Sequence, residues 1–281
     1  MANLKRNKTE KKHQKYLNLA FQQAEINLGS TNTNPSVGCV VEKNGSVISS
    51  GHTSFNGRPH AEINALKKKI NFKGANIYVT LEPCSHFGKT PPCVNKIIKK
   101  GIKYVYFSVS DADKRSQNKS KKIFASNRIK TNSNVLAKKG YNFYKSYFNY
   151  HNNKFPIIDS KIALSKDYFT INKNSKWISN NYSRKITHLI RSRYSCLVST
   201  SESINKDNPL LNCRIEGLES KTPDLVIIDR NLKIKKGLKI FKYKIRRKIL
   251  IFTSNNNKKK IKLLTKSSHV KVFYLKNMNK K

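Results

Sequence analysis

The sequence predicts an α/β protein of two domains. Its 281 residues, 37% of them hydrophobic, exceed the usual size of one domain and suffice for two cores. In both halves, short β-branched or aromatic runs alternate with segments of helical periodicity, which is typical of mostly parallel sheets covered by helices. This pattern weakens over residues 114–154. We therefore expect domains at 13–150 and 155–281, with the boundary near residues 150–155.

The chain opens with a basic arm followed by an amphipathic helix. Residues 1–12 carry little hydrophobic pattern, whereas hydrophobic residues recur at helical spacing over 17–28, before Gly29, a typical helix end. The run 37–49 is typical of two strands that turn at Asn44-Gly45, the dipeptide preferred in tight hairpins.

The remainder of the first half predicts a pair of parallel strands. Strands are expected at 75–81 and 104–109, with helices at 60–69 and 94–100. A strand, a crossover helix and a second strand place the two strands side by side and parallel.

The second half predicts another mostly parallel sheet, with a helix at 181–193 and no internal repeat. The strand-like runs lie at 155–164, 196–199, 225–229, 249–253 and 270–275.

Hydropathy and cysteine usage indicate a cytoplasmic protein without a membrane segment. No apolar run approaches the ~20 residues needed to cross a bilayer, and the first residues lack the apolar centre of a signal peptide. Five cysteines are too few and too odd in number for a disulfide scaffold, so clustered cysteines are better interpreted as metal ligands or nucleophiles.

The charge is strongly positive, with 58 basic and 15 acidic residues and a formal net charge of +43. Of the basic residues 47 are lysine and 11 arginine, and the lysines accompany Asn and Ile throughout the chain. This distribution indicates compositional drift. Nucleic-acid grooves usually combine Arg with stacking aromatics, so a nucleic-acid partner is disfavoured and attraction of a phosphorylated small molecule is favoured.

One cluster of residue types carries chemistry. Within 34 residues the chain contains His60-Ala-Glu62, Cys84 and Cys93. One histidine and two cysteines suit zinc, and three protein ligands leave the fourth tetrahedral position for water, as in catalytic sites. Glu62, two residues after His60, is placed to move the proton of that water without ligating the metal.

This arrangement indicates hydrolytic deamination. Zinc nucleobase deaminases carry His-x-Glu followed by Pro-Cys-x-x-Cys, with the Glu as acid and base. Here eight residues separate Cys84 from Cys93, which leaves room for His86 and Lys89 to face the substrate. The longer spacing argues against the versions that act on simple nucleosides or nucleic acids.

Four alternatives remain open at this point. The zinc could be structural and closed by His86 or Cys39 as a fourth ligand, or the cluster could hold no metal. The enzyme could act on a base in RNA or DNA, or the domain could be a zinc-stabilised binding module with a decayed site. For His86 we favour substrate contact over metal ligation, and Cys39, Cys196 and Cys213 are treated as ordinary half-buried residues.

The first domain resembles the deaminase half of the bifunctional riboflavin-biosynthesis deaminase/reductase family. The resemblance spans residues 14–111 and rests on Asn34-Pro-Ser-Val-Gly-Cys-Val, Pro59-His-Ala-Glu and Thr80-Leu-Glu-Pro-Cys-Ser-His-Phe-Gly-Lys-Thr-Pro-Pro-Cys93. It implies a cytidine-deaminase-like three-layer domain and a pyrimidine substrate carrying a ribosylamine phosphate. By this resemblance His60, Cys84 and Cys93 hold zinc, Glu62 is the proton shuttle, and Asn34, His86 and Lys89 contact the substrate.

Two departures from the family pattern stand out. Seven positions before His60 the family usually has histidine, where this chain has Thr53 with His52 beside it. Either His52 substitutes through a loop one residue longer or that contact is lost. After Asp111, a Pro-containing, Gly-rich family stretch is replaced by residues 112–120.

The second domain is similar to the family's reductase half, a dihydrofolate-reductase-like sheet that uses NADPH. The resemblance implies that Ala163, Trp177, Ser203 and Asp207 face NADPH, and that Lys161, Ser175, Arg191, Leu211 and Arg214 face the phosphorylated substrate. The alternatives are a core anchor for Trp177 and a solvated helix face for Arg191.

Family members continue past the last expected strand into a Glu-Gly-Gly turn that can bind cofactor phosphates. This sequence ends in a polar tail at Lys281, so we expect a partial reductase domain with an exposed sheet edge. Reduction is then expected to be weak, missing, supplied by another chain or restored in a homo-oligomer.

Overall fold

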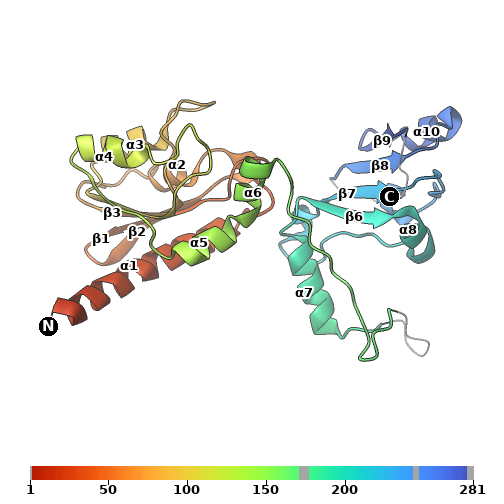
Figure 1. Cartoon of the computed structure of the whole chain (residues 1–281), viewed down its shortest axis with the longest axis horizontal. Coiled ribbons are helices and arrows are strands. Elements are labelled where there is room, and N and C mark those ends of the chain that lie inside the picture. The colour runs from red at the N-terminus through yellow and green to blue at the C-terminus, as the bar shows by residue number, and fades with distance from the viewer. Residues whose placement is uncertain (1, 171–176, 243–246, 277–281) are drawn as a thin grey trace. The chain divides into compact units, whose positions relative to one another are not determined.

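The computed structural model describes residues 2–170, 177–242 and 247–276, and the side chains of these residues from Lys11 onward. Contacts divide the chain into two compact units, Met1–Ser160 and Lys161–Lys281. Each unit contains one mixed or parallel sheet with its own hydrophobic core (Figure 1).

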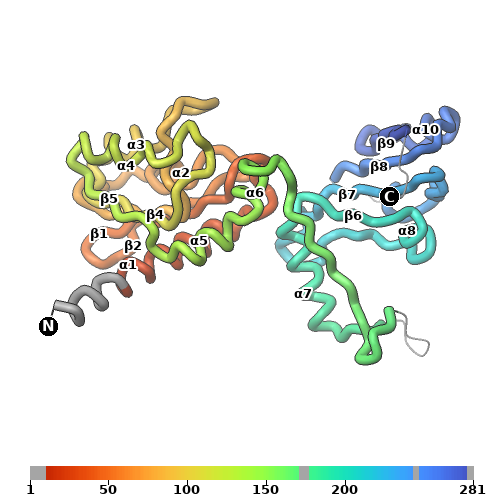
Figure 2. Tube along the Cα trace, in the orientation of Figure 1, coloured from red at the N-terminus to blue at the C-terminus, as the bar shows by residue number. Residues whose placement is uncertain are grey.

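The first unit is built on a five-stranded mixed sheet of order β2-β1-β3-β4-β5, with β5 at the edge beside β4 (Figure 2). β1 pairs antiparallel with β2 and β3, whereas β3, β4 and β5 run parallel. The hairpin expected at Asn44-Gly45 and the parallel pair are confirmed. The strands are β1 Gly38–Lys43, β2 Ser46–His52, β3 Asn76–Leu81, β4 Tyr104–Val109 and β5 Lys130–Asn132.

Helices cover both faces of this sheet, so the unit has three layers (Figure 1). Helices α1 (Ala2–Glu25) and α5 (Ala137–Phe143) lie on one face. On the other lie α2 (Ala61–Ala65), α3 (Cys93–Lys99) and α4 (Ser120–Ser126). The residues expected to form a basic arm belong to α1, and α2 is shorter than the helix expected at 60–69. A 3-10 turn Phe55–Gly57 precedes α2, and α6 (Lys145–Asn153) follows α5.

Two glycines let helices approach the sheet backbone. A Cβ on Gly38 would lie 1.8 Å from the carbonyl oxygen of Ala20 in α1. A Cβ on Gly51 would lie 2.5 Å from the backbone nitrogen of Ala65 in α2. Both helices therefore pack on bare backbone, and α2 in particular lies tight against β2.

The second unit is a parallel sheet of order β6-β7-β8-β9. Its core is formed mainly by Ile and Leu side chains of the strands and the segments between them. The strands are β6 Cys196–Thr200, β7 Asp224–Ile228, β8 Ile249–Thr253 and β9 Val270–Tyr274, and the helices are α7 Asn181–Arg191, α8 Ser201–Asp207, α9 Lys239–Lys242 and α10 Lys258–Leu264, with a 3-10 turn at Glu219–Lys221.

The strand expected at 155–164 is wrong. These residues form no regular element, and Ile158 and Ile162 are 77% and 64% exposed. Hydrophobic alternation reports a suitable side-chain pattern, but a strand also needs a neighbour for its backbone groups. In the described part of the second sheet, β6 pairs with β7, and no strand pairs with 155–164.

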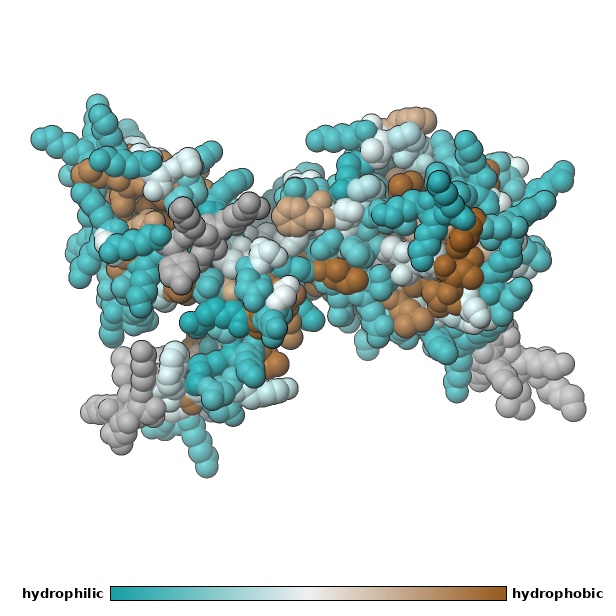
Figure 3. Space-filling view, turned by 180° about the vertical axis from the view of Figure 1, so that it is seen from behind, coloured by the Kyte–Doolittle hydropathy of each residue, from teal (hydrophilic) through white to brown (hydrophobic). Residues whose placement is uncertain are grey.

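The surface matches the lysine-rich composition. On the face seen in Figure 3, hydrophilic side chains dominate both units. Of the helices in the described ranges, none combines the length and the apolar character that a membrane crossing requires.

Candidate active site

His60, Cys84 and Cys93 meet on the face of the first sheet that carries α2 and α3. His60 directly precedes α2, Cys84 follows β3, and Cys93 is the first residue of α3. The Nδ1 atom of His60 lies 3.6 Å from Sγ of Cys84 and 3.4 Å from Sγ of Cys93. Three segments distant in sequence thus bring their ligand atoms together.

The donor set fits tetrahedral zinc. Zinc–nitrogen and zinc–sulfur bonds of about 2.0 and 2.3 Å, at a tetrahedral angle, put nitrogen and sulfur ligands roughly 3.6 Å apart. The observed separations match this value, and all three ligand atoms lie within 4.8 Å of one another. The group has three members among the described residues, as an open site requires.

Neither suggested fourth ligand joins this group. Nδ1 of His86 is instead 2.7 Å from the hydroxyl of Ser116. Cys39 lies buried on β1, where burial and then the charge of Glu62 raise the pKa of its thiol. Within the described ranges, the geometry therefore favours a three-ligand site over the closed structural one.

Hydrogen bonds favour the deprotonated form of one of the two cysteines. The backbone N–H of Cys93 donates to Sγ of Cys84 over 3.3 Å. A hydrogen bond from the Cys93 thiol, followed by that from His60, lowers the pKa of Cys84 to about 4 despite burial. The pKa of Cys93 moves upward, since its proton is the one shared with the Cys84 sulfur. Cys84 thus favours the thiolate form that binds metals.

Glu62 lies in the first turn of α2 and is only 3% exposed. Burial, and then the nearby Cys84 thiolate, raise its pKa to about 7. A carboxyl group with a pKa near neutrality can both accept and return a proton, which is the property required of an acid–base residue.

The residues expected to contact the substrate lie on, or hydrogen-bond to, segments that carry the metal ligands. His86 and Lys89 lie on the loop between the two cysteines, with Lys89 exposed. The side-chain amide of Asn34 donates to the carbonyl oxygen of Gly57 over 3.1 Å, just before His60. The buried Thr53 hydroxyl accepts a hydrogen bond from the N–H of Val37 at 2.9 Å, so its partner is the backbone just before β1.

Arg58 is a neighbour that the sequence analysis missed. Its guanidinium donates to the Thr90 hydroxyl. A Cβ on Gly88 would lie 3.6 Å from Nη2 of Arg58 and 3.7 Å from Nε2 of His86. The signal available in the sequence was a cation two residues before a metal-ligating histidine.

In the second unit, Arg191, Leu211 and Arg214 converge. Nη1 of Arg191 donates to the carbonyl oxygen of Asn212 over 2.6 Å, and Nη2 of Arg214 lies 3.2 Å from Nε2 of His188. Burial, followed by the charge of Arg214, lowers the pKa of Arg191. Arg191 is therefore half-buried at the 210–214 loop, which excludes the solvated-face interpretation.

The sequence analysis also missed Arg247. It is 5% exposed and donates to the carbonyl oxygens of Leu210 and Leu211, over 2.6 and 2.8 Å. Burial, followed by the charge of Arg191, lowers its pKa to about 10. A buried guanidinium thus supports the backbone beside Arg191.

The other expected residues of this unit are more scattered. Ser203 and Asp207 lie on α8, directly after β6, and the N–H of Ser203 donates to the Thr200 hydroxyl at 3.3 Å. Trp177 is 52% exposed, with the Arg184 guanidinium 4.5 Å from its ring centroid, so it is no core anchor. Lys161 and Ala163 lie in the irregular segment after residue 160, and Ser175 lies outside the described residues.

Comparison with known proteins covers both units. Residues 10–109 match the cytidine and deoxycytidylate deaminase zinc-binding region, and residues 158–280 match the RibD C-terminal domain. Riboflavin biosynthesis protein RibD of Aquifex aeolicus is 35% identical over 95% of this chain and 76% of its own length. That of Buchnera aphidicola is 33% identical over 95% of this chain and 74% of its own length.

The chain belongs to the RibD family.

Solved structures agree. The RibD-type deaminase/reductase of Thermotoga maritima superposes with a TM-score of 0.82 at 30% identity, covering 94% of this chain and 74% of that one. RibD of Acinetobacter baumannii superposes with a TM-score of 0.81 at 25% identity, covering 96% and 75%. The expected cytidine-deaminase-like domain, the reductase-like domain and their roles in riboflavin biosynthesis are confirmed.

The RibD assignment also settles the cofactors and the class of substrate. Zinc belongs to the deaminase domain, where the His/Cys/Cys group provides its ligands, and the RibD C-terminal domain is NADPH-dependent. RibD-type enzymes act on phosphorylated pyrimidines.

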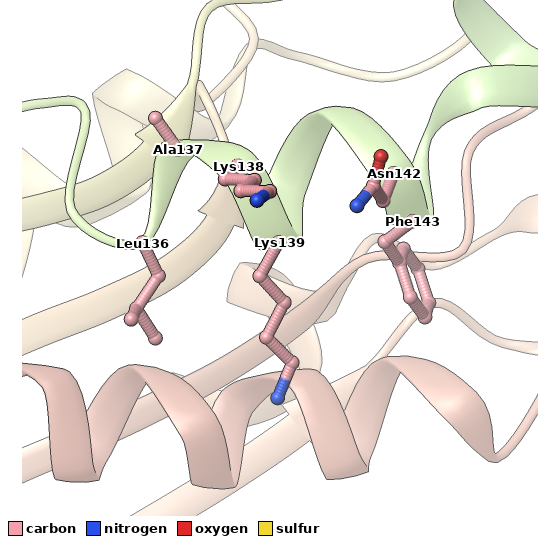
Figure 4. A pocket seen from close by; sticks show the side chains of 6 residues that line it. All are labelled: Leu136, Ala137, Lys138, Lys139, Asn142 and Phe143. Carbon is pink, nitrogen blue, oxygen red and sulfur yellow. The ribbon is translucent and has the colours of Figure 1, made fainter.

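A hollow of about 740 Å³ on this RibD chain has no part in that chemistry. It lies between α5 and α1, where Leu136, just before α5, and Lys139 and Phe143 of α5 point toward α1 (Figure 4). The Lys139 ammonium donates to the side-chain oxygen of Asn18 over 2.7 Å. These helices cover the face of the sheet opposite α2 and α3, so the hollow is a seam of helix packing (Figure 1).

Proposed function

We propose that the first domain hydrolyses an exocyclic amine from diaminohydroxyphosphoribosylaminopyrimidine, the reaction named for the Thermotoga maritima relative. The observation that carries this proposal is the three-ligand cluster with the buried Glu62 beside it. A bound zinc would supply a polarised water and Lewis-acid stabilisation. Glu62 takes up one proton and returns it to the leaving nitrogen, for which a pKa of about 7 is well matched.

We propose that Asn34, His86 and Lys89 hold the substrate. The positions of His86 and Lys89 support this role, because both lie on the loop that joins the zinc ligands Cys84 and Cys93. The Lys89 ammonium suits a dianionic phosphate, to which it can donate charge-assisted hydrogen bonds.

Metal content and ammonia release test the proposal. Cys84→Ser and Cys93→Ser should each lose both bound zinc and activity, whereas Glu62→Gln should keep zinc and lose turnover by about 10²- to 10⁴-fold. Glu216→Gln, an exposed carboxyl of the second unit, is the matched control. A zinc-loaded Glu62→Gln enzyme with normal turnover would exclude this mechanism.

The same ammonia assay separates the alternatives. Release from the pyrimidine phosphate but not from oligonucleotides supports the proposal. Release from oligonucleotides identifies a nucleic-acid base deaminase, and zinc binding without release from either identifies a binding module.

We propose that the second domain places NADPH against Ala163, Trp177, Ser203 and Asp207, and the phosphorylated pyrimidine against Lys161, Ser175, Arg191, Leu211 and Arg214. Ser203 and Asp207 support the first set because they follow the carboxyl end of β6, where parallel sheets bind ligands. The convergence of Arg191 and Arg214 supports the second. NADPH titration followed by fluorescence and NADPH oxidation on the deaminated product test the two steps separately, and Arg191→Ala should weaken only the second.

A cytoplasmic location and a homo-oligomer stay predictions. The location is supported by Cys84 and Cys93, which bind metal only as reduced thiols. Fractionation of cells and light scattering of the purified protein would test them.

A further inference from the structure

The loop 111–120, far from the zinc ligands in sequence, contacts the loop that carries His86. Ser116 at its centre is fully buried. Its hydroxyl oxygen accepts from the backbone N–H of Ser85 over 3.2 Å and lies 2.7 Å from Nδ1 of His86. Ser116 therefore contacts the chain immediately after the zinc ligand Cys84.

The buried Glu82 carboxylate holds this loop on both sides of Ser116. One oxygen accepts from the N–H groups of Asp111 and Asn118, over 3.2 and 3.0 Å. The other accepts from the N–H and hydroxyl of Ser120, over 3.2 and 2.7 Å. Four hydrogen-bond donors of the loop thus converge on one buried carboxyl group, which fixes the loop on both sides of Ser116.

The Ser116 hydroxyl group has one proton and two lone pairs. It accepts from the Ser85 N–H and lies 2.7 Å from Nδ1 of His86, to which its proton can be donated. A ring that accepts this proton at Nδ1 carries its own proton on Nε2. Nε2 faces the open side of Gly88, where a Cβ would lie 3.7 Å away and Arg58 borders the same space.

We propose that Ser116, held in place by Glu82, is a positioning residue that directs the Nε2–H of His86 toward an oxygen of the phosphorylated pyrimidine. The inference rests on the substrate contact proposed for His86. The inference adds Ser116 and Glu82, to which neither the family resemblance nor the motif spacing assigns a role. It also gives a function to residues 112–120, where this chain departs from the family: they position His86.

A double-mutant cycle between Ser116 and His86 tests the proposal. Ser116→Ala should raise KM for the pyrimidine phosphate about tenfold, as expected for one orienting hydrogen bond. It should leave zinc stoichiometry unchanged and kcat within about threefold. Ser116→Thr retains the hydroxyl and should restore most of the affinity. Ser126→Ala, on the exposed side of α4, is the control and should change nothing.

The decisive measurement is Ser116→Ala in a His86→Ala background. If Ser116 acts through His86, the second substitution has no further effect on KM, whereas an unrelated structural effect adds to the first. Additive effects therefore overturn the proposal. So does an unchanged KM in Ser116→Ala when His86→Ala alone raises KM, a result that leaves the proposed function intact.

An unchanged KM in His86→Ala removes the substrate contact itself and the inference with it. Glu82→Gln provides a second route should Ser116→Ala fold poorly, because it loosens the same loop without touching His86. It should raise KM in the parent protein and leave KM unchanged in the His86→Ala background. Equal increases in both backgrounds would overturn the proposed path through the loop.

Discussion

Gly51 is the position where a single added carbon should disturb both stability and activity. A Cβ there would lie 2.5 Å from the backbone nitrogen of Ala65 and 2.6 Å from the carbonyl oxygen of Ala61, both in α2. Ordinary contact begins at 3.4 Å, so in Gly51→Ala the helix must retreat by about 0.9 Å. Because His60 precedes α2 and Glu62 lies in its first turn, the retreat moves both residues.

Two magnitudes follow from this displacement. Overpacking of a dense core costs about 1 to 3 kcal/mol of unfolding free energy. A misplacement of about 1 Å at reacting groups costs about 100-fold in rate. Gly45→Ala is the matched control: Gly45 has a φ of +87°, yet a Cβ there would meet nothing within 4 Å. It should cost about 1 kcal/mol through backbone strain alone and leave turnover unchanged.

Urea unfolding, bound zinc per chain and ammonia release measure the three effects. We expect Gly51→Ala to lose stability and most of its turnover, and Gly45→Ala to lose stability alone. The reasoning fails if Gly51→Ala keeps full zinc and a turnover within threefold of the parent, or if Gly45→Ala loses turnover to the same degree.

Three further predictions concern other residues. Burial lowers the pKa of His13, which stacks on Tyr106, below its ordinary 6.5. Near this pH the unfolded chain binds more protons than the folded chain, so the free energy of unfolding should fall as the pH drops from about 7.5 to about 5.5. The fall should be smaller in His13→Phe. Equal falls in the parent and the variant would contradict this prediction. Arg247→Lys removes one of the two hydrogen bonds to carbonyl oxygens and should lower the free energy of unfolding of the second unit by about 1 to 2 kcal/mol. An unchanged midpoint of urea unfolding would contradict this prediction. Arg58→Ala should raise KM severalfold for the phosphorylated pyrimidine and not for its dephosphorylated form, and equal effects on both would remove a phosphate role for Arg58.

Much of the first unit could be predicted from the sequence because its signals are local. The Asn44-Gly45 turn, the strand and helix periods and the Pro-Cys and His-Ala-Glu strings each lie within a few residues. His60 directly precedes α2, Cys84 follows β3 and Cys93 begins α3, so each ligand stands near a junction of elements that the sequence pattern locates. Composition favoured a phosphorylated small molecule over nucleic acid, and RibD-type enzymes act on phosphorylated pyrimidines.

The second unit shows where this approach fails. The run 155–164 has the alternation of a strand, yet alternation does not reveal whether a neighbouring strand is present to pair with it. Arg247 looks like one more basic residue of a lysine-rich chain, and only packing shows its guanidinium buried against two carbonyl oxygens.

The sequence by itself thus indicated the two-domain α/β class, the His/Cys/Cys group that fits zinc and the carboxyl group proposed for acid–base chemistry, because coordination chemistry demands particular residue types at short spacings. Only the tertiary structure showed the contacts around these residues. Ser116 contacts His86, Glu82 accepts hydrogen bonds from the 111–120 loop, and Gly51 packs against the backbone of α2. Those contacts join residues tens of positions apart, and they depend on distances of a few ångströms between backbones, which no pattern of residue types along the chain encodes.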